Sequence, residues 1–75
     1  MTSPSQSQAT RNLILDSAQR LFARKGLDPT TIKEIGAESG LNPALLYYYF
    51  ESKEELYRAV ARILAQVFYR FKGAM

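Results

Sequence analysis

The stretch TIKEIGAESGLNPALLYYYF, residues 31–50, decides the fold. Thr31 followed by Glu34 is a capping box, in which each side chain satisfies a backbone donor at the start of a helix. Gly40 ends this short helix, and Asn42 with Pro43 starts the next one as N-cap and first-turn proline. Two short helices joined so tightly have to cross steeply. We therefore predict a helix-turn-helix.

Two glycines and two large apolar residues set the geometry of this motif. The turn needs a positive φ, which glycine adopts freely, and Gly40 supplies it. Gly36 lies where the helices cross, and its missing side chain lets the first helix approach the second. Leu46 and Phe50, one turn apart, are expected to fill the underside of the second helix.

Longer helices are predicted on both sides of this stretch. Upstream, apolar residues at helical spacing form one face, with Thr10 as the expected N-cap and Gly26 as the expected stop. Downstream, Ser52 followed by Glu55 is a second capping box, which opens a helix that runs to Gly73. The upstream face consists of Ile14, Ala18, Leu21 and Phe22, and the downstream stripe of Leu56, Val60, Ile63, Leu64, Val67 and Phe71.

These patterns predict an all-α fold, a three-helix helix-turn-helix (homeodomain-like) bundle plus a long fourth connecting helix. Residues 1–9 are expected to be a disordered tail and residues 10–56 the helix-turn-helix domain, with the reader at 31–50. Residues 53–72 are expected to lead into a C-terminal domain that this chain lacks. On this last helix, Leu56, Val60 and Ile63 are predicted to join the core. Nothing local can bury the residues beyond them, so we predict an interface formed by Leu64, Val67, Phe68 and Phe71.

The composition is that of one small folded domain. Of the 75 residues, 47% are hydrophobic and 23% are charged, a balance that argues against disorder. Cysteine and histidine are absent, which excludes disulfides and the usual zinc ligands, and we expect no cofactor. A core of this size supplies only about 3–5 kcal/mol, so we expect further stability from a second copy or an adjoining domain. The sequence shows no signal peptide and no membrane-length apolar run, so a cytoplasmic location is expected.

Charge is distributed unevenly along the chain. The net charge of +3 weakly favours a polyanionic partner. Between residues 27 and 52, however, Lys33 is the only basic residue, whereas four residues there are acidic. The basic residues near the end of the upstream helix, Arg20, Arg24 and Lys25, are expected to face solvent. Charge alone would therefore not select residues 31–50 as a DNA-binding segment.

The outward face of the second short helix suits insertion into a major groove. Alanine and leucine can touch thymine methyl groups, and tyrosine can bond phosphates or base edges. Lys33 and Lys53, near the starts of the second and fourth helices, could clamp phosphates on either side. With Leu46 and Phe50 inward, the outward residues are Ala44, Leu45 and Tyr48, and Tyr47 and Tyr49 lie at the boundary.

The combined pattern resembles the DNA-binding domain of the tetracycline-repressor (TetR) family over roughly residues 10–70. It rests on Ile14, Leu15, Ala18, Leu21, Phe22, Gly26, Thr31, Ile35, Gly40, Leu46, Tyr47, Phe50, Lys53 and Leu56. The resemblance implies a double-stranded DNA operator, read by the second and third helices. It also implies a homodimer formed through the missing C-terminal domain and a small-molecule inducer bound in that domain. The operator contacts that it implies are Thr31, Lys33, Pro43, Ala44, Leu45, Tyr47, Tyr48, Tyr49 and Lys53.

Other readings of the same residues remain open at this point. Tyr47, Tyr48 and Tyr49 could form a core aromatic cluster, and Lys33 and Lys53 could be solvated surface charges. A helical protein–protein interaction module without DNA binding is the alternative function. An enzyme is not expected, because the chain has no histidine, cysteine or glycine-rich phosphate loop.

Overall fold

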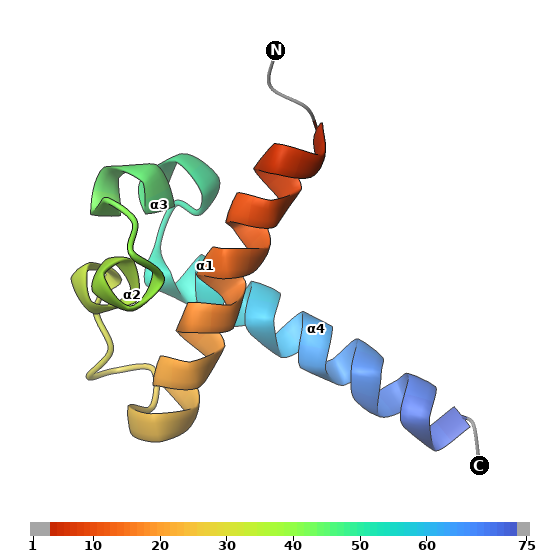
Figure 1. Ribbon diagram of the computed structural model, residues 1–75. Helices are drawn as coiled ribbons and strands as arrows, with labels where there is room; N and C mark the ends of the chain where they lie inside the picture. The colour runs from red at the N-terminus through yellow and green to blue at the C-terminus, as the bar shows by residue number, and fades with distance from the viewer. Residues whose placement is uncertain (1–3, 74–75) are drawn as a thin grey trace.

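Four helices follow one another in the computed structural model, which describes residues 4–73 of the chain and the side chains of residues 7–70 (Figure 1). They are α1 (Pro4–Lys25), α2 (Ile32–Ser39), α3 (Pro43–Tyr49) and α4 (Lys53–Gly73). No strand occurs within the described range. The predicted all-α fold is therefore confirmed.

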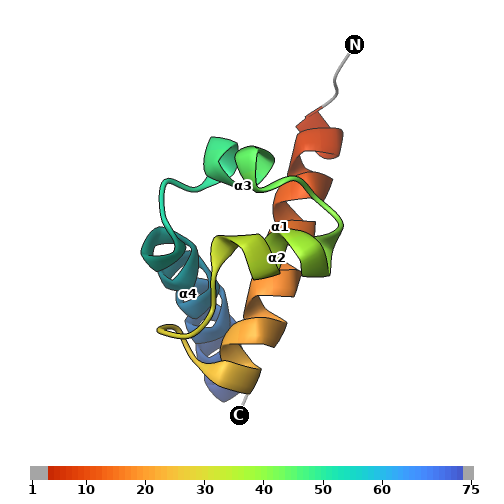
Figure 2. The same ribbon diagram turned by 90° about the vertical axis from the view of Figure 1, so that its left-hand side faces the viewer.

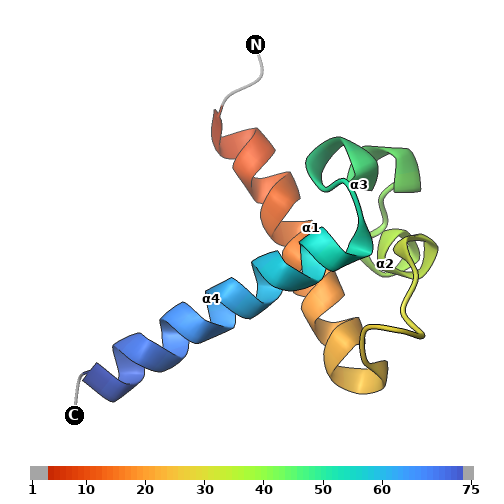
Figure 3. The ribbon, with the colours of Figure 1, turned by 180° about the vertical axis from the view of Figure 1, so that it is seen from behind.

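Helix α1 forms the centre of the arrangement. Helices α2 and α3 lie together on one side of it, as the view from that side shows (Figure 2). Helix α4 crosses α1 and extends away from α2 and α3 (Figures 1 and 3). All four helices contribute to one core, which consists of Ile14, Leu15, Ala18, Leu21, Phe22, Ile32, Ile35, Leu46, Phe50, Leu56 and Val60.

Local capping signals place the ends of the short helices where the sequence predicts them. The Thr31 hydroxyl accepts from the Glu34 N–H (3.1 Å), and the Glu34 carboxylate accepts from the Thr31 N–H (3.0 Å), which completes the capping box of α2. The Asn42 side chain accepts from the Ala44 N–H at 2.8 Å and caps α3. In α4, the Ser52 hydroxyl accepts from the Glu55 N–H as expected. The Glu55 carboxylate instead accepts from Glu51 N–H, so only half of that second box forms.

The start of α1 differs from the prediction. Helix α1 begins at Pro4, and Thr10, the expected N-cap, lies inside it. Residues 4–9 are thus helical rather than a disordered tail, and residues 1–3 lie outside the described range. Proline fits the first turn of a helix because its φ is pre-set and a donor is not needed there. A hydrogen bond from the Gln8 amide to the Asn12 side chain (3.1 Å) then links successive turns.

Helix α4 leaves the core sooner than predicted. Val60 is the last buried residue among the side chains of α4 that the structure describes, and Ile63, expected in the core, is 39% exposed. Ile63 borders an open depression between α1 and α4, together with Asn12 and Leu15, and solvent therefore reaches part of its side chain. Leu64, Val67 and Phe68 are exposed as predicted, whereas the side chain of Phe71 lies outside the described residues. None of the helices in the described range is long and apolar enough to cross a membrane.

Candidate nucleic-acid interface

The turn between α2 and α3 depends on its two glycines. Gly40 has φ 76° and φ/ψ in the left-handed region, where a side chain would strain the backbone. Its N–H donates to the Ala37 carbonyl, and the Leu41 N–H donates to the Gly36 carbonyl at 2.9 Å. A Cβ atom at Gly36 would lie 2.8 Å from the Leu41 carbonyl oxygen. Both glycines thus allow the turn to fold tightly against α2, as the sequence predicts.

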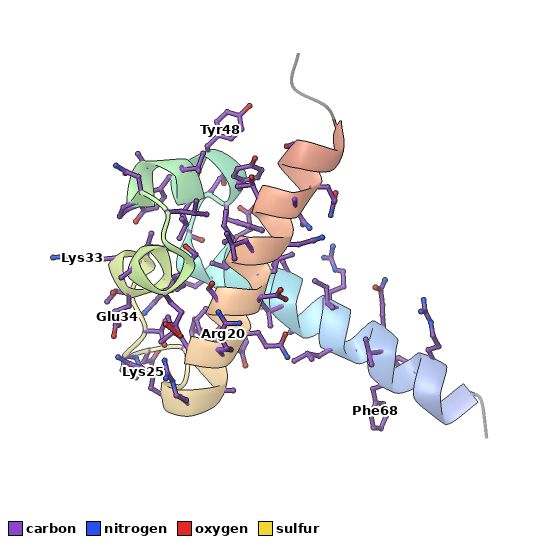
Figure 4. All side chains as sticks on the ribbon, in the orientation of Figure 1. Arg20, Lys25, Lys33, Glu34, Tyr48 and Phe68 are labelled. Carbon is purple, nitrogen blue, oxygen red and sulfur yellow. The ribbon has the colours of Figure 1, made fainter. Side chains whose placement is uncertain are left out.

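One face of helix α3 packs on the core and the opposite face is exposed to solvent. Leu46 is fully buried and Phe50 nearly so, and these two side chains attach the helix to the core. On the opposite face Tyr48 is 80% exposed and Tyr47 54% exposed. Tyr48 projects away from the bundle (Figure 4). The predicted outward direction of Tyr48 is therefore correct, and an aromatic core cluster of all three tyrosines is excluded.

The other residues predicted on α3 follow the same division. Ala44 and Leu45 are exposed, and Pro43 is half-buried in the first turn. Tyr49 is also half-buried and packs against the core. Its ring meets that of Tyr48 edge to face, with centroids 5.3 Å apart. The exposed surface is thus built from small, apolar and hydroxyl-bearing side chains.

Acidic residues of α2 are neutralised from α1. Lys25 donates to the Glu34 carboxylate at 2.5 Å, and Arg24 lies 3.4 Å and Arg20 3.8 Å from the Glu38 carboxylate. These three cations, expected simply to face solvent, each bind a partner. The hydrogen bond from Lys25, followed by that from the Thr31 N–H, holds the pKa of Glu34 below its usual value. The local acidity of residues 27–52 is therefore offset by residues that lie far away in the sequence.

Lys33 lies on a different face of α2 from these ion pairs. Its side chain is exposed and projects away from α1, whereas Glu34 lies close to Lys25 (Figure 4). Among the side chains that the structure describes, no salt bridge involves Lys33. Its charge therefore remains available on the side of the molecule that carries α2 and α3.

Lys53 has a different environment from the one predicted. Its ammonium donates to three backbone carbonyls of the loop between α1 and α2, those of Leu27 (3.0 Å), Asp28 (2.8 Å) and Thr30 (2.9 Å). An ammonium has three N–H donors, so all of them are used inside the protein. A phosphate contact would require Lys53 to give up these bonds. The Lys53 ammonium thus holds the loop between α1 and α2, and its phosphate contact stays a prediction.

Three of the predicted residues nevertheless meet at one place. Thr31, Tyr47 and Lys53 line a shallow depression between the start of α2, the outer side of α3 and the start of α4. Glu51 and Glu54 also line it, so the depression is not a purely basic one. Within the described residues, no cluster of His, Cys, Asp or Glu could hold a metal ion.

Comparison with known proteins matches the same part of the chain. The family model described as "Bacterial regulatory proteins, tetR family" matches residues 14–60, which run from the first to the last buried core residue. The chain is 42% identical over 48 residues to the biofilm operon icaADBC HTH-type negative transcriptional regulator IcaR of Staphylococcus epidermidis, an overlap of 64% of this chain and 26% of that protein. No solved structure matched significantly.

Two further relatives match over a similar length. The HTH-type transcriptional repressor KstR2 of Mycolicibacterium smegmatis is 37% identical over 59 residues, or 79% of this chain and 29% of the relative. The HTH-type transcriptional regulator AcrR of Shigella flexneri is 34% identical over 55 residues, or 73% and 26%. The match thus spans only about a quarter of the length of these relatives.

Proposed function

Because this chain belongs to the tetR family of bacterial regulatory proteins, we propose that it binds double-stranded DNA and places α3 in the major groove. The observation that carries this proposal is the tyrosine face of α3. Tyr48 is 80% exposed, while Leu46 and Phe50 beneath it are buried. An exposed aromatic face on a short, firmly seated helix is costly for a surface with no partner and suits one that reads bases.

Each predicted contact has a role in this proposal. Ala44 and Leu45 would touch thymine methyl groups, and Tyr48 would reach a base edge or a phosphate. Thr31 and Lys33 at the start of α2 would meet the phosphate backbone of the same groove. Lys53 would hold the α1–α2 loop, and with it the start of α2, in place. Pro43 and Tyr47 would contact phosphates, whereas the predicted Tyr49 contact would be made by its ring edge, because its hydroxyl lies 3.3 Å from that of Ser7.

The ion pairs between α1 and α2 support α2 and α3 as the DNA-binding face. Glu34 and Glu38 are bound by cations of α1, whereas Lys33 is exposed on the outer side of α2. DNA approaching α2 and α3 would therefore meet less negative charge than the sequence of residues 27–52 suggests. Each phosphate neutralised by a cation makes binding more sensitive to salt, with a slope of about −0.9 per contact.

The finer mechanism concerns the whole regulator. We propose a cytoplasmic, ligand-responsive repressor that binds a pseudo-palindromic operator as a dimer, with half-sites about one helical turn apart. Leu64, Val67 and Phe68 on α4, with Phe71, would pack against a C-terminal domain that dimerises and binds a small-molecule inducer. Two of the relatives, a negative transcriptional regulator and a transcriptional repressor, support repression. Without a dimer interface that fixes the spacing, a single copy should bind its half-site weakly.

The test compares two tyrosines of similar exposure. Duplexes are first selected from a random-sequence pool with this chain at low salt, and affinity for the selected duplex is then measured by fluorescence anisotropy. Tyr48→Ala should weaken binding by about 1–3 kcal/mol if Tyr48 contacts a base. Tyr69→Ala, which removes a tyrosine that is 73% exposed on α4, should leave it unchanged.

The alternative, a helical module that binds protein and not DNA, predicts a different result. In that case selection enriches no sequence, and binding to any duplex is weak and independent of both tyrosines. Equal losses for Tyr48→Ala and Tyr69→Ala would also remove α3 from the DNA interface.

A further inference from the structure

Residues 7–13 of α1, the first whose side chains the structure describes, contribute no residue to the core. The first buried residue of α1 in the described part of the chain is Ile14, although the helix begins at Pro4. Ten helical residues thus precede the part of α1 that packs against α2 and α4. The first turns of α1 extend on the side of the bundle where α3 lies (Figure 1). This segment must find its contacts elsewhere.

Two side chains of this segment contact the end of α3. The Ser7 hydroxyl lies 3.3 Å from the Tyr49 hydroxyl, a hydrogen bond between residues 42 positions apart. The Arg11 guanidinium lies over the Phe50 ring, with its Cζ 5.3 Å from the ring centroid. Ser7 and Arg11 are one turn apart and therefore share a face of α1. Tyr49 is the last residue of α3, and Phe50 is its C-cap.

These contacts matter because α3 depends on its neighbours for its orientation. With seven residues it is too short to be stable alone, so its direction depends on what it packs against. Leu46 and Phe50 attach its underside to the core, on the face opposite the exposed Tyr48. Tyr49 links the two faces, because its ring packs against the core and also meets the ring of the exposed Tyr48 edge to face. A continuous series of contacts thus runs from Ser7 through Tyr49 to Tyr48.

We propose that residues 7–11 of α1 are a brace for the reading helix, and that Ser7 is a positioning residue for DNA recognition. The inference rests on the proposed DNA binding and adds to it a determinant outside α2 and α3. By fixing the Tyr49 ring, Ser7 restricts the directions that the Tyr48 ring can take before DNA arrives. Restricting the free protein in this way increases affinity because less freedom is lost on binding.

A double-mutant cycle tests the brace. Ser7→Ala and Tyr49→Phe should each weaken binding to the selected duplex about two- to ten-fold, the worth of one hydrogen bond. The double variant should bind no more weakly than the weaker single variant, because both changes remove the same interaction. Gln8→Ala is the matched control, since Gln8 lies on the same turn and its one side-chain bond among the described residues is to Asn12 within α1. It should leave the affinity unchanged.

A second measurement separates positioning from folding and from direct contact. In the free protein, Ser7→Ala should shift the ring resonances of Tyr48 in NMR spectra without lowering the melting temperature, and Gln8→Ala should shift neither. If Ser7 contacted a phosphate itself, the losses of the two single variants would add and the Tyr48 resonances would stay in place. That result, or equal affinities for Ser7→Ala and Gln8→Ala, would overturn the brace while leaving the proposed function intact. Failure of the unaltered chain to bind any duplex would overturn both.

Discussion

Two lysines that the sequence presents as equivalent have opposite surroundings, and substituting each by methionine separates their roles. Lys53 donates to three loop carbonyls at 2.8–3.0 Å, whereas Lys33 is exposed and has no salt bridge among the described residues. A hydrogen bond from a charged donor contributes about 1.5–3 kcal/mol. The three bonds do not add up, because the ammonium is hydrated in the unfolded parent chain and the exposed Asp28 carbonyl can bind water in the folded variant. We therefore expect Lys53→Met to lower the free energy of unfolding by about 1–3 kcal/mol.

A loss of this size is easily measured in so small a domain. For a domain of this length, 1 kcal/mol corresponds to a shift of about 4–8 °C in melting temperature. Urea unfolding followed by circular dichroism should show a lower midpoint for Lys53→Met with an unchanged m-value, since the same surface is exposed. Lys33→Met should leave the free energy of unfolding within about 0.5 kcal/mol of that of the parent chain.

DNA binding should depend on Lys33 more than on Lys53, the reverse of the effect on stability. Under conditions where both variants are folded, Lys33→Met should weaken binding to all sequences alike and flatten the salt slope by about one. Lys53→Met should keep the salt slope of the parent chain. A Lys53→Met protein of normal stability and reduced salt slope would show that Lys53 binds phosphate, and the positioning role would then be wrong.

Two further predictions concern stability. Gly40→Ala should lower the free energy of unfolding by about 1–2 kcal/mol in urea, because φ 76° strains any side chain there although no atom lies within 4 Å of the added Cβ; an unchanged midpoint would mean that the turn is not left-handed in solution. The pKa of Glu34 is held below 4.5 in the folded chain, so its stabilising effect is present above the unfolded value and is lost as the pH falls through the folded one. Glu34→Gln keeps an acceptor for the capping box but loses the charge that binds Lys25. When unfolding is measured from pH 7 down to pH 3, the stability of this variant should therefore fall less than that of the parent chain. Equal losses in the two proteins would show that the ion pair does not form.

Local signals in the sequence account for the helices nearest the site. The capping residues of α2 and α3 act on backbone groups two or three positions away, and Gly40 acts through its own φ. Such interactions need no tertiary structure, which is why the two short helices and their turn are predictable. The outward direction of Tyr48 follows as well, because helical spacing fixes it once Leu46 is buried. The start of α1 is not predictable in this way, because Thr10 resembles an N-cap while no residue between Pro4 and Thr10 prevents an earlier start.

The electrostatics and bracing of the site arise only when distant residues meet. Nothing near Lys53 in the sequence indicates that its ammonium binds carbonyls 23 to 26 residues earlier, and nothing near Tyr49 indicates a bond to Ser7. Likewise, Glu38 is an unpaired acid in the sequence and a paired one in the fold. The sequence alone determined the extents of α2 and α3 and which face of α3 is exposed. The packing of α1 against the other helices decided which charges remain available there, because side-chain partners are selected by distance in space and not along the chain.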